Sequence, residues 1–265
     1  VGDGVDEARE KVGKLAGALD AADEALTVAP AMLGSDGPRR YFVAVQNNAE
    51  ARATGGLIGA FALVTTDRGR IVLDRTGTDD ELPVLDGPVP SHPLAALIWR
   101  RYGSSQVWYS ANLTPNFPDV GRNLSQMWVE DNGGVIDGVL ALDPLVISEL
   151  LRVAGPVTLA DGLKITADSV VDFVGRDEYV RYPHVPTRKK ILSTLAEQIF
   201  ERVVESGDSV RTLQAFARSG QSGHLFLWSR VAGEQRILGR HLIGGTLPRE
   251  DIPYLQVLTQ NRGGN

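Results

Sequence analysis

Short runs of apolar residues, typical of β-strands, follow one another near the start of the chain. Such runs occupy residues 41–46, 57–66 and 70–75, and each one predicts a strand. Asp67-Arg68-Gly69, between the second and third runs, is typical of a hairpin turn. The pattern therefore predicts a β-meander at the beginning of the globular part.

Apolar residues with the period of a helix precede this meander. Apolar residues follow one another at spacings of three and four, which predicts an amphipathic helix that ends near Ala29-Pro30; they are Val12, Leu15, Leu19, Ala22 and Leu26. The helix is either the stub of a coiled coil that leads from a membrane anchor or a helix that packs on the domain. We divide the chain into a helix and linker over 1–37 and a core domain over 38–265, which a further β-rich part is expected to follow.

Helices and strands alternate in the rest of the chain. Helices are predicted over 94–102, 120–132, 146–153, 167–174, 188–205 (with Thr187 as its cap), 209–219 and 231–240, and strands over 135–142, 224–228 and 254–259, with a hairpin over 156–166. The polar segment 76–92 predicts a long surface loop. This order favours an α/β fold in which a central mixed sheet is flanked by helices.

Composition narrows the class of protein. The chain has 265 residues, of which 43% are hydrophobic and 23% charged, as in ordinary soluble domains. Its net charge of −6 argues against a general nucleic-acid binder. It has no cysteine, which excludes disulfides, thiol catalysis and cysteine-bound zinc. The sequence contains no run of about 20 apolar residues, the length that spans a bilayer.

The stretch from Tyr41 to Leu73 carries the first candidate site. Arg52 and the pair Gly55-Gly56 stand between two predicted strands, where a positive charge and flexible backbone amides suit an anion. The glycines do not fit a dinucleotide-binding motif, because the β-rich FALVTT follows them where a helix is required. Two interpretations stay open: a ligand-facing loop with Arg52, or glycines that only permit a tight turn or bulge.

A second candidate is the aromatic loop over residues 107–119. Its polar side chains could bind sugar hydroxyls, and Trp108 or Tyr109 could stack on a sugar ring. The polar candidates are Asn112, Asn116 and Asp119. The alternative is a rigid loop held by its prolines and by Asx turns.

Two acidic residues flank the predicted strand over 135–142. Asp137 and Asp143 are six residues apart, so strand alternation places both on one face. Such a pair could bind Mg²⁺ or act as general acid and base. Asp143-Pro144 is also typical of a helix N-cap followed by proline, which is the competing interpretation.

Basic residues gather between 176 and 190. Arg181, Arg188 and Lys189, with Lys190, could form a phosphate clamp at the start of a helix. The alternative is a solvated basic surface. The four histidines have no metal-ligand spacing, and the sequence contains no G-x-S-x-G elbow of a serine hydrolase.

Several segments resemble a bacterial cell-envelope family of unknown function from actinobacteria, domain-of-unknown-function family 4012. They are FVAVQNNAEARATGGLIGAF, WYSANLTPNFPDV, GGVIDGVLALDPLVISELLRVAGPVTL and ITADSVVDFVGRDEYVRYPH. The resemblance runs from Arg39 to Asn265. It implies an extracytoplasmic protein whose full-length form carries an N-terminal membrane anchor.

The same segments are more distantly similar to the LytR-CpsA-Psr proteins, which transfer glycopolymers from polyprenyl-pyrophosphate carriers to peptidoglycan. That resemblance implies their fold, Mg²⁺ as a cofactor, and phosphate-binding arginines at Arg52 and near Arg188. Gly55-Gly56 stands where those enzymes carry an acidic residue. Asp74-Arg75 has the reverse order of their Pro-Arg-Asp motif.

We therefore expect a domain that acts on or binds envelope glycopolymers or polyprenyl-phosphate-linked glycans, with phosphotransfer as the candidate activity. In that case Arg52, Arg181 and Arg188 would hold a phosphate, and Asp137 or Asp143 would hold a metal or serve as base. A non-catalytic polysaccharide-binding module and a glycan hydrolase using two of Asp119, Asp137 and Asp143 are the alternatives.

Overall fold

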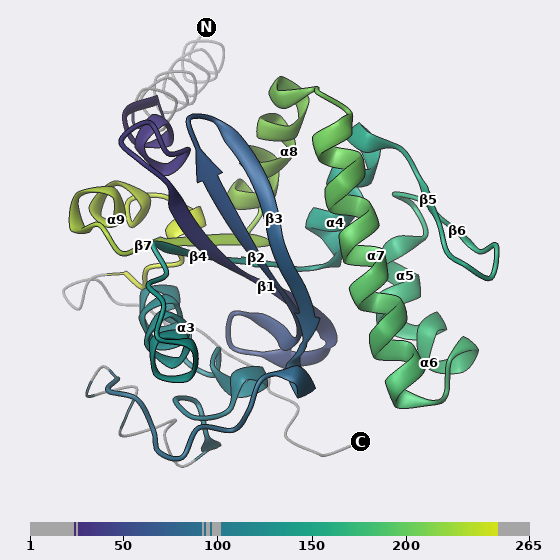
Figure 1. Ribbon diagram of the computed structural model, residues 1–265, viewed down its shortest axis with the longest axis horizontal. Coiled ribbons are helices and arrows are strands. Elements are labelled where there is room, and N and C mark those ends of the chain that lie inside the picture. Colours follow the sequence, from purple (N-terminus) through teal and green to yellow (C-terminus); the bar gives the residue numbers. More distant parts are fainter. Residues whose placement is uncertain (1–23, 25, 92, 94–95, 97–101, 249–265) are drawn as a thin grey trace, which may run out of the picture.

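A five-stranded mixed sheet forms the centre of the protein, in the order β3-β2-β1-β4-β7 (Figure 1). The computed structural model describes residues 24, 26–91, 93, 96 and 102–248. The strands are β1 (Arg39–Arg52), β2 (Gly55–Asp67), β3 (Arg70–Thr78), β4 (Gly138–Leu142) and β7 (Leu225–Ser229). β1 runs parallel to β4, whereas the other neighbouring pairs are antiparallel. The predicted mixed sheet is confirmed.

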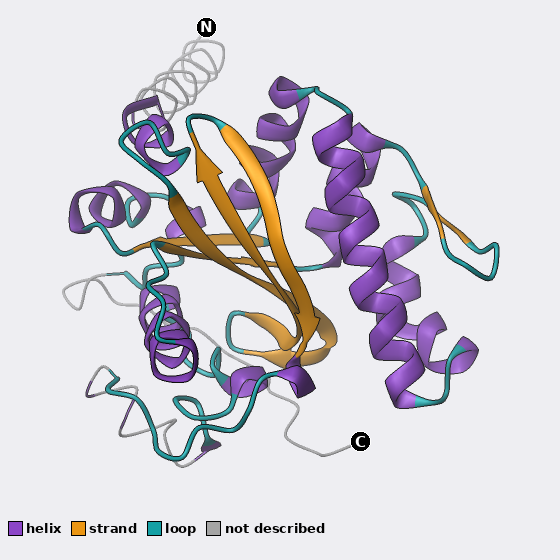
Figure 2. Cartoon of the chain, in the orientation of Figure 1, coloured by secondary structure: helices purple, strands orange, loops and turns teal. Residues whose placement is uncertain are grey.

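Helices cover both faces of this sheet (Figure 2). They are α3 (Phe117–Asn132), α4 (Pro144–Ala154), α5 (Val170–Asp172), α6 (Glu178–Arg181), α7 (Val185–Glu205), α8 (Ser209–Gln221) and α9 (Ala232–Leu238). A π-helical turn over Phe173–Asp177 joins α5 to α6, and β5 (Val157–Thr158) pairs with β6 (Lys164–Ile165) in a small separate hairpin. α3 lies on one side of the sheet, and α4 and α7 lie on the other. The α/β class is confirmed.

The alternation along β1 separates two cores. Phe42 and Ala44 point into the core beneath α3, whereas Val43 and Val45 pack with the apolar residues of α4 and α7. Phe42 is fully buried and stacks on Phe61, with ring centroids 5.6 Å apart. Because successive side chains of a strand point to opposite faces, one apolar strand supports both layers.

The segment 76–92 differs from its prediction as a surface loop. Its first residues extend β3, and Leu82, Leu85 and Val89 are buried in the core beneath α3. The indole Nε1 of Trp108 donates a hydrogen bond to the backbone oxygen of Pro83 (2.9 Å). The apolar side chains of this segment close the α3 side of the sheet, so it is part of the packed core.

The start of α7 also differs. The helix begins at Val185 with His184 as its N-cap residue, and Thr187 lies inside the first turn, where its Oγ1 contacts His184 Nδ1 (3.0 Å). Pro186 explains the earlier start, because proline is favoured in the first helical turn. The predicted strand over 254–259 and most of the predicted helix over 94–102 lie outside the described residues.

Most of the predicted N-terminal helix also lies outside the described residues, but residues 26–32 are helical and continue past Pro30. Val28 and Met32 are buried against the sheet beside Tyr41. The backbone oxygen of Met32 accepts hydrogen bonds from Tyr41 Oη (2.6 Å) and Thr66 Oγ1 (2.8 Å). This end of the helix therefore packs on the domain. Within the described residues, no helix has the length and apolar character needed to cross a bilayer.

Candidate functional site

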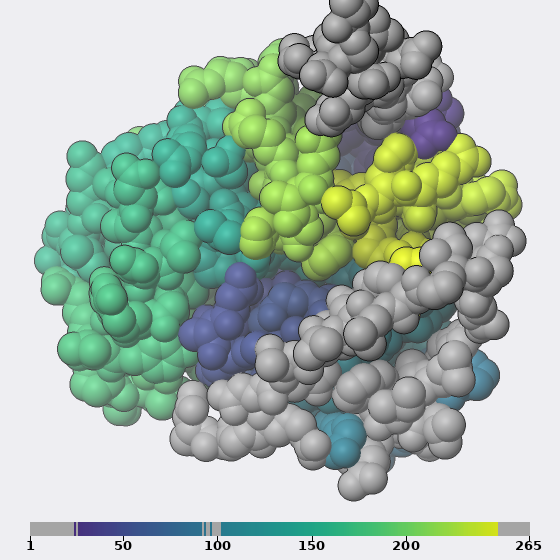
Figure 3. All heavy atoms as spheres, turned by 180° about the vertical axis from the view of Figure 1, so that it is seen from behind, coloured from purple at the N-terminus to yellow at the C-terminus, as the bar shows by residue number. Residues whose placement is uncertain are grey.

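A wide bulge interrupts β1 near the tip of the β1–β2 hairpin. The antiparallel pairing goes from Asn47↔Leu57 directly to Ala51↔Gly56, which leaves residues 48–50 outside the ladder. The Asn47 Oδ1 accepts from the backbone N–H of Ala49 (3.0 Å) and fixes the bend. Figure 3 shows the hairpin, in indigo, at the molecular surface beside α8. Bulges of this kind redirect side chains next to functional sites.

The two glycines of the hairpin serve close backbone packing. A Cβ atom at Gly56 would lie 1.9 Å from the backbone oxygen of Asn47, and Gly55 has a φ of 115°. The Nδ2 of Asn112, a fully buried side chain, donates to the backbone oxygen of Gly56 (2.7 Å). The tight-turn interpretation of the glycines therefore fits the structure, and β2 stands where a dinucleotide motif needs a helix.

An aspartate–histidine pair lies beside the bulge. The Nδ1 of His224 is 2.6 Å from Asp143 Oδ2, which also accepts from Asn48 Nδ2 (2.8 Å). Because an ionised carboxylate only accepts, Nδ1 is the donor, and Nε2 then carries the imidazole lone pair. The Asp143 side chain is 4% exposed and that of His224 is 35% exposed. A buried carboxylate that orients a half-exposed imidazole is an arrangement suited to proton abstraction.

The sheet topology explains why these residues meet. β1 and β4 are parallel, so their carboxyl ends lie side by side in the sheet. The bulge lies toward that end of β1, and Asp143 directly follows β4. β7 is antiparallel to β4, and Leu225 pairs with Leu142. His224 immediately precedes β7 and is therefore placed beside Asp143.

A second polar cluster joins the bulge to α6 and α7. The Nδ2 of Asn47 donates to Tyr179 Oη (2.9 Å), which lies 3.3 Å from Glu50 Oε1. The guanidinium of Arg188 stacks over the Tyr179 ring at 4.5 Å. Beneath it, Glu178 is 1% exposed, and its Oε1 is 4.0 Å from Arg188 Nε. Burial raises the pKa of Glu178 to about 8, against the opposing effect of Arg188.

Arg52 lies at the tip side of the bulge and is half-buried. Its Nη1 donates to the backbone oxygen of Ala51 (3.1 Å), and burial lowers its pKa, while the charges of Glu50 and Tyr109 act in the opposite direction. Glu50 links the two arginines indirectly, because its charge acts on Arg52 and its carboxylate accepts from Tyr179, over which Arg188 stacks. The structure thus brings Arg52 and Arg188 to one region.

The other members of the predicted phosphate clamp point elsewhere. Arg181 is paired with Asp161 of the β5–β6 turn (2.8 Å). Lys189 is paired with Asp79 (2.8 Å) and also contacts the next carboxylate. In the described part of the chain Arg181, Arg188 and Lys189 thus contact different carboxylates, and a clamp that all three form stays a prediction. Their positions on a short helix and the following long helix direct them to different partners.

The predicted carboxylate pair is also wrong as geometry. Asp137 precedes β4 and Asp143 follows it, so the two residues occupy opposite ends of the strand. Six residues along a strand span about 20 Å, although both side chains share a face. The competing N-cap interpretation of Asp143 is confirmed, because its Oδ1 accepts from the backbone N–H of Leu145 (2.9 Å).

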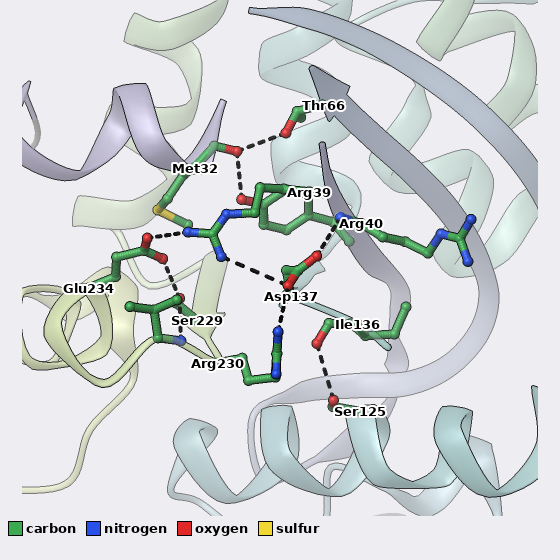
Figure 4. A network of polar contacts seen from close by, with 12 residues as sticks. Met32, Arg39, Arg40, Thr66, Ser125, Ile136, Asp137, Ser229, Arg230 and Glu234 are labelled. Carbon is green, nitrogen blue, oxygen red and sulfur yellow. Dashed lines mark hydrogen bonds and ion pairs between the residues drawn. The ribbon is translucent and has the colours of Figure 1, made fainter. Parts of the chain in front are cut away.

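Asp137 joins the starts of β1 and β4 to the end of β7 (Figure 4). Its Oδ1 accepts from Arg230 (3.0 Å), and its Oδ2 accepts from the backbone N–H of Arg40 (3.0 Å). Arg39 contacts it at 3.8 Å and pairs with Glu234 at 2.5 Å. These contacts give Asp137 a structural role at one end of β4, whereas Asp143 and His224 lie at the other end.

The aromatic loop contributes mainly packing. Trp108 is 1% exposed and stacks on Phe42, so it has no free face for a sugar ring; that prediction is wrong. The Nδ2 of Asn116 donates to Asp119 (2.9 Å), which also pairs with Arg122 at the start of α3. Tyr109 is 42% exposed and is the aromatic side chain of this loop that remains accessible.

Asp143 does not fit a resident Mg²⁺ ion. Its two oxygens accept from Asn48, His224 and the backbone N–H groups of Leu145 and Val146, so donors fill its acceptor positions. The described part of the chain brings together no group of three acidic or histidine side chains that could hold a metal. Mg²⁺ stays a prediction from the resemblance.

The sequence alone did not point to Asn48, Glu178, Tyr179 or His224. The Asn-Asn pair within the first strand was the available signal for Asn48, because two adjacent amides are unusual in an apolar strand. His224, directly before an apolar strand, had no local partner to mark it. Its pairing with Asp143 depends on strand order.

Comparisons with known proteins give a family match and distant similarities to solved structures, three of which are described here. The chain matches the family described as "Protein of unknown function (DUF4012)" over residues 36–179. No curated protein sequence matches it. Protein gbs0355 from Streptococcus agalactiae is 12% identical with a TM-score of 0.43, over 82% of this chain and 76% of that chain.

Two further solved structures come from Bacillus subtilis. The transcriptional regulator yvhJ is 12% identical with a TM-score of 0.37, over 76% of each chain. TagV is 10% identical with a TM-score of 0.33, over 79% of this chain and 80% of that chain. All three neighbours are LytR-CpsA-Psr proteins, the group that the sequence resembles. Likeness at this level carries no chemistry over to this chain.

The family match includes the hairpin with its bulge, Asp143 and Tyr179, whereas His224 and Arg188 lie beyond it. It spans more than half of the 265 residues. The family predicted from the sequence is thereby confirmed. The chain belongs to the DUF4012 family of proteins of unknown function.

Proposed function

We propose that this protein acts outside the cytoplasm on envelope glycopolymers and transfers a phosphorylated glycan from a polyprenyl carrier to a hydroxyl acceptor. The observation that carries the reaction type is the Asp143–His224 pair beside the bulge of β1. Arg52 beside the bulge and Arg188 over the Tyr179 ring would supply the positive charge for a phosphate. The substrate class rests on the sequence resemblance to LytR-CpsA-Psr proteins.

In this mechanism His224 is the general base. Its Nε2 takes the proton of the acceptor hydroxyl while the hydroxyl oxygen attacks phosphorus. The bond between phosphorus and the bridging oxygen of the carrier breaks, and the carrier phosphate leaves with the electron pair. Asp143 holds the imidazole in its tautomer and stabilises the imidazolium that forms. Arg52 and Arg188 stabilise the charge that develops on the phosphoryl oxygens.

A non-catalytic glycan-binding module is the second candidate. The observation that favours it is the capping role of Asp143, which accounts for this residue without chemistry. In such a module the exposed Asn48 and Tyr109 would contact the glycan, and Arg52 would hold its phosphate. Both candidates use the same bulge, so turnover is what separates them.

The test is a transfer assay with a short polyprenyl-pyrophosphate-linked glycan and a soluble glycan acceptor. His224→Ala is expected to lower the rate by at least about 100-fold, the usual contribution of a general base. His184→Ala, at the exposed start of α7, is the matched control and should keep the wild-type rate. Transfer that survives His224→Ala would refute the proposed base.

Binding is measured separately by mass spectrometry of lipids that co-purify with the protein. Wild-type protein should retain a polyprenyl-phosphate lipid, and Arg52→Ala should retain less of it. Retention of a glycan-linked lipid without any transfer would favour the binding module. Equal lipid retention by the two proteins would remove Arg52 from the phosphate site.

A further inference from the structure

A basic hollow lies at the opposite end of β7 from His224. It has a volume of about 670 Å³ and is lined by residues of α3, the end of β7 and α9. Figure 1 shows where these three elements lie. Four arginines line it: Arg122, Arg230, Arg236 and Arg240. The described residues that line it include no acidic side chain. The whole chain has a net charge of −6, so a lining with four arginines differs from its average surface.

Three of these arginines are held in place from behind. Arg122 pairs with Asp119, Arg230 with Asp137 and Arg240 with Glu24. Each gives one guanidinium nitrogen to its carboxylate and is about half-exposed, so other N–H donors of the fork remain directed to solvent. An ion pair of this kind orients a donor without using all of its donor groups.

Arg236 adds a fourth positive charge to the hollow. It is exposed on α9 and makes no ion pair within the described part of the chain, and Arg240, just beyond the end of α9 at Leu238, lines the same hollow. Beside it, Gln235 accepts from the backbone N–H of Ser229 through Oε1 (2.9 Å), which turns its amide nitrogen away from that contact. Pro118 and Trp228 add apolar surface. Guanidinium forks over an apolar floor suit a chain of anionic groups joined by carbon-rich units.

We propose that this hollow binds a linear polymer of phosphodiester-linked units. The choice of phosphate over carboxylate rests on the proposed function. His224 and Arg230 flank the five residues of β7, so about 20 Å separates the hollow from the candidate base. A polymer of several units can occupy both places, with the hollow holding repeats distant from the reacting end.

The test measures binding of fluorescent poly(glycerol phosphate) by anisotropy at low and physiological salt. Arg122→Gln/Arg236→Gln should weaken binding by about tenfold and reduce its salt dependence. The matched control is Arg70→Gln/Arg211→Gln, because Arg70 is exposed without an ion pair among the described residues and Arg211 pairs with Asp208 as Arg122 does with Asp119. The control should bind as the wild type does.

The comparison ligands are neutral dextran and polygalacturonate. Dextran should not bind, and polygalacturonate should bind more weakly than poly(glycerol phosphate). Equal losses in the two double variants would mean general charge attraction and would overturn the proposal, as would an absence of wild-type binding. Stronger binding of polygalacturonate would overturn the phosphate assignment. Binding is measured without a polyprenyl carrier and so without any transfer step, and failure of the transfer reaction and failure of the hollow are therefore read independently.

Discussion

Replacing Glu178 by glutamine should change the pH dependence of stability. Burial raises the pKa of Glu178 from 4.5 to about 8 in the folded protein. Between these values the unfolded chain releases the proton while the folded protein keeps it, so the folded state loses stability as the pH rises. Below pH 4.5 both states hold the proton, and the carboxyl imposes no such cost. Glu178→Gln removes this titration with little change of shape.

The magnitude follows from the distance between the two pKa values. Between the two pKa values, each pH unit lowers the free energy of unfolding by about 1.4 kcal/mol. The loss reaches about 4 kcal/mol at pH 8 relative to acidic solution. A typical domain has only about 5 to 15 kcal/mol in total, so the effect is large. The positive charge of Arg188, 4.0 Å away, opposes the burial effect, and the pKa of about 8 already includes this opposition.

The assay is urea unfolding followed by tryptophan fluorescence at pH 5, 6.5 and 8. The free energy of unfolding of Glu178→Gln should rise relative to the wild type by about 3 to 4 kcal/mol across this range. Glu205→Gln, at an exposed position on α7, is the control and should give a constant difference. Parallel profiles for Glu178→Gln and the wild type would refute the reasoning, because they would mean that Glu178 is ionised in the folded protein.

Three further substitutions test the core, the hairpin and the network of Figure 4. Phe42→Ala should lower the free energy of unfolding by about 3 to 5 kcal/mol in urea, since the ring is fully buried; a loss below about 1 kcal/mol would contradict its central place. Gly56→Ala should cost about 3 kcal/mol or more, and protease cleavage at the hairpin should reveal it, because the new methyl group meets the Asn47 oxygen. Asp137→Asn should cost about 1 to 3 kcal/mol by thermal unfolding yet keep the transfer rate; loss of transfer in the folded variant would return Asp137 to the catalytic candidates.

The meander could be predicted from the sequence because its signals are local. Short apolar runs mark its strands, and the turn between β2 and β3 follows from its residues. Arg68 and Gly69 both adopt positive φ, at 47° and 80°, which is the backbone that such a two-residue turn requires. The predicted helix over 120–132 was found for the same reason, since its period is contained within the segment.

The candidate site depends on relations that no local pattern contains. Asp143 and His224 are 81 residues apart and meet only because β4 pairs with both β1 and β7. Strand alternation places Asp137 and Asp143 on one face, but the length of β4 keeps the two side chains apart. The position of the bulge in β1 could not be predicted either, because it depends on which residues of β1 pair with which residues of β2.

The hydrogen-bonded carbonyl of Met32 gives the domain a defined point of mechanical attachment. Tension along the helix over 26–32 would pass through the contacts to Tyr41 and Thr66 into the adjoining strands β1 and β2 at once. Those contacts lie at the ends of β1 and β2 remote from their hairpin tip. Tension on the helix over 26–32 would therefore act first on the start of β1 and the end of β2. The positions of Asp143 and His224, at the other end of the sheet, would change last.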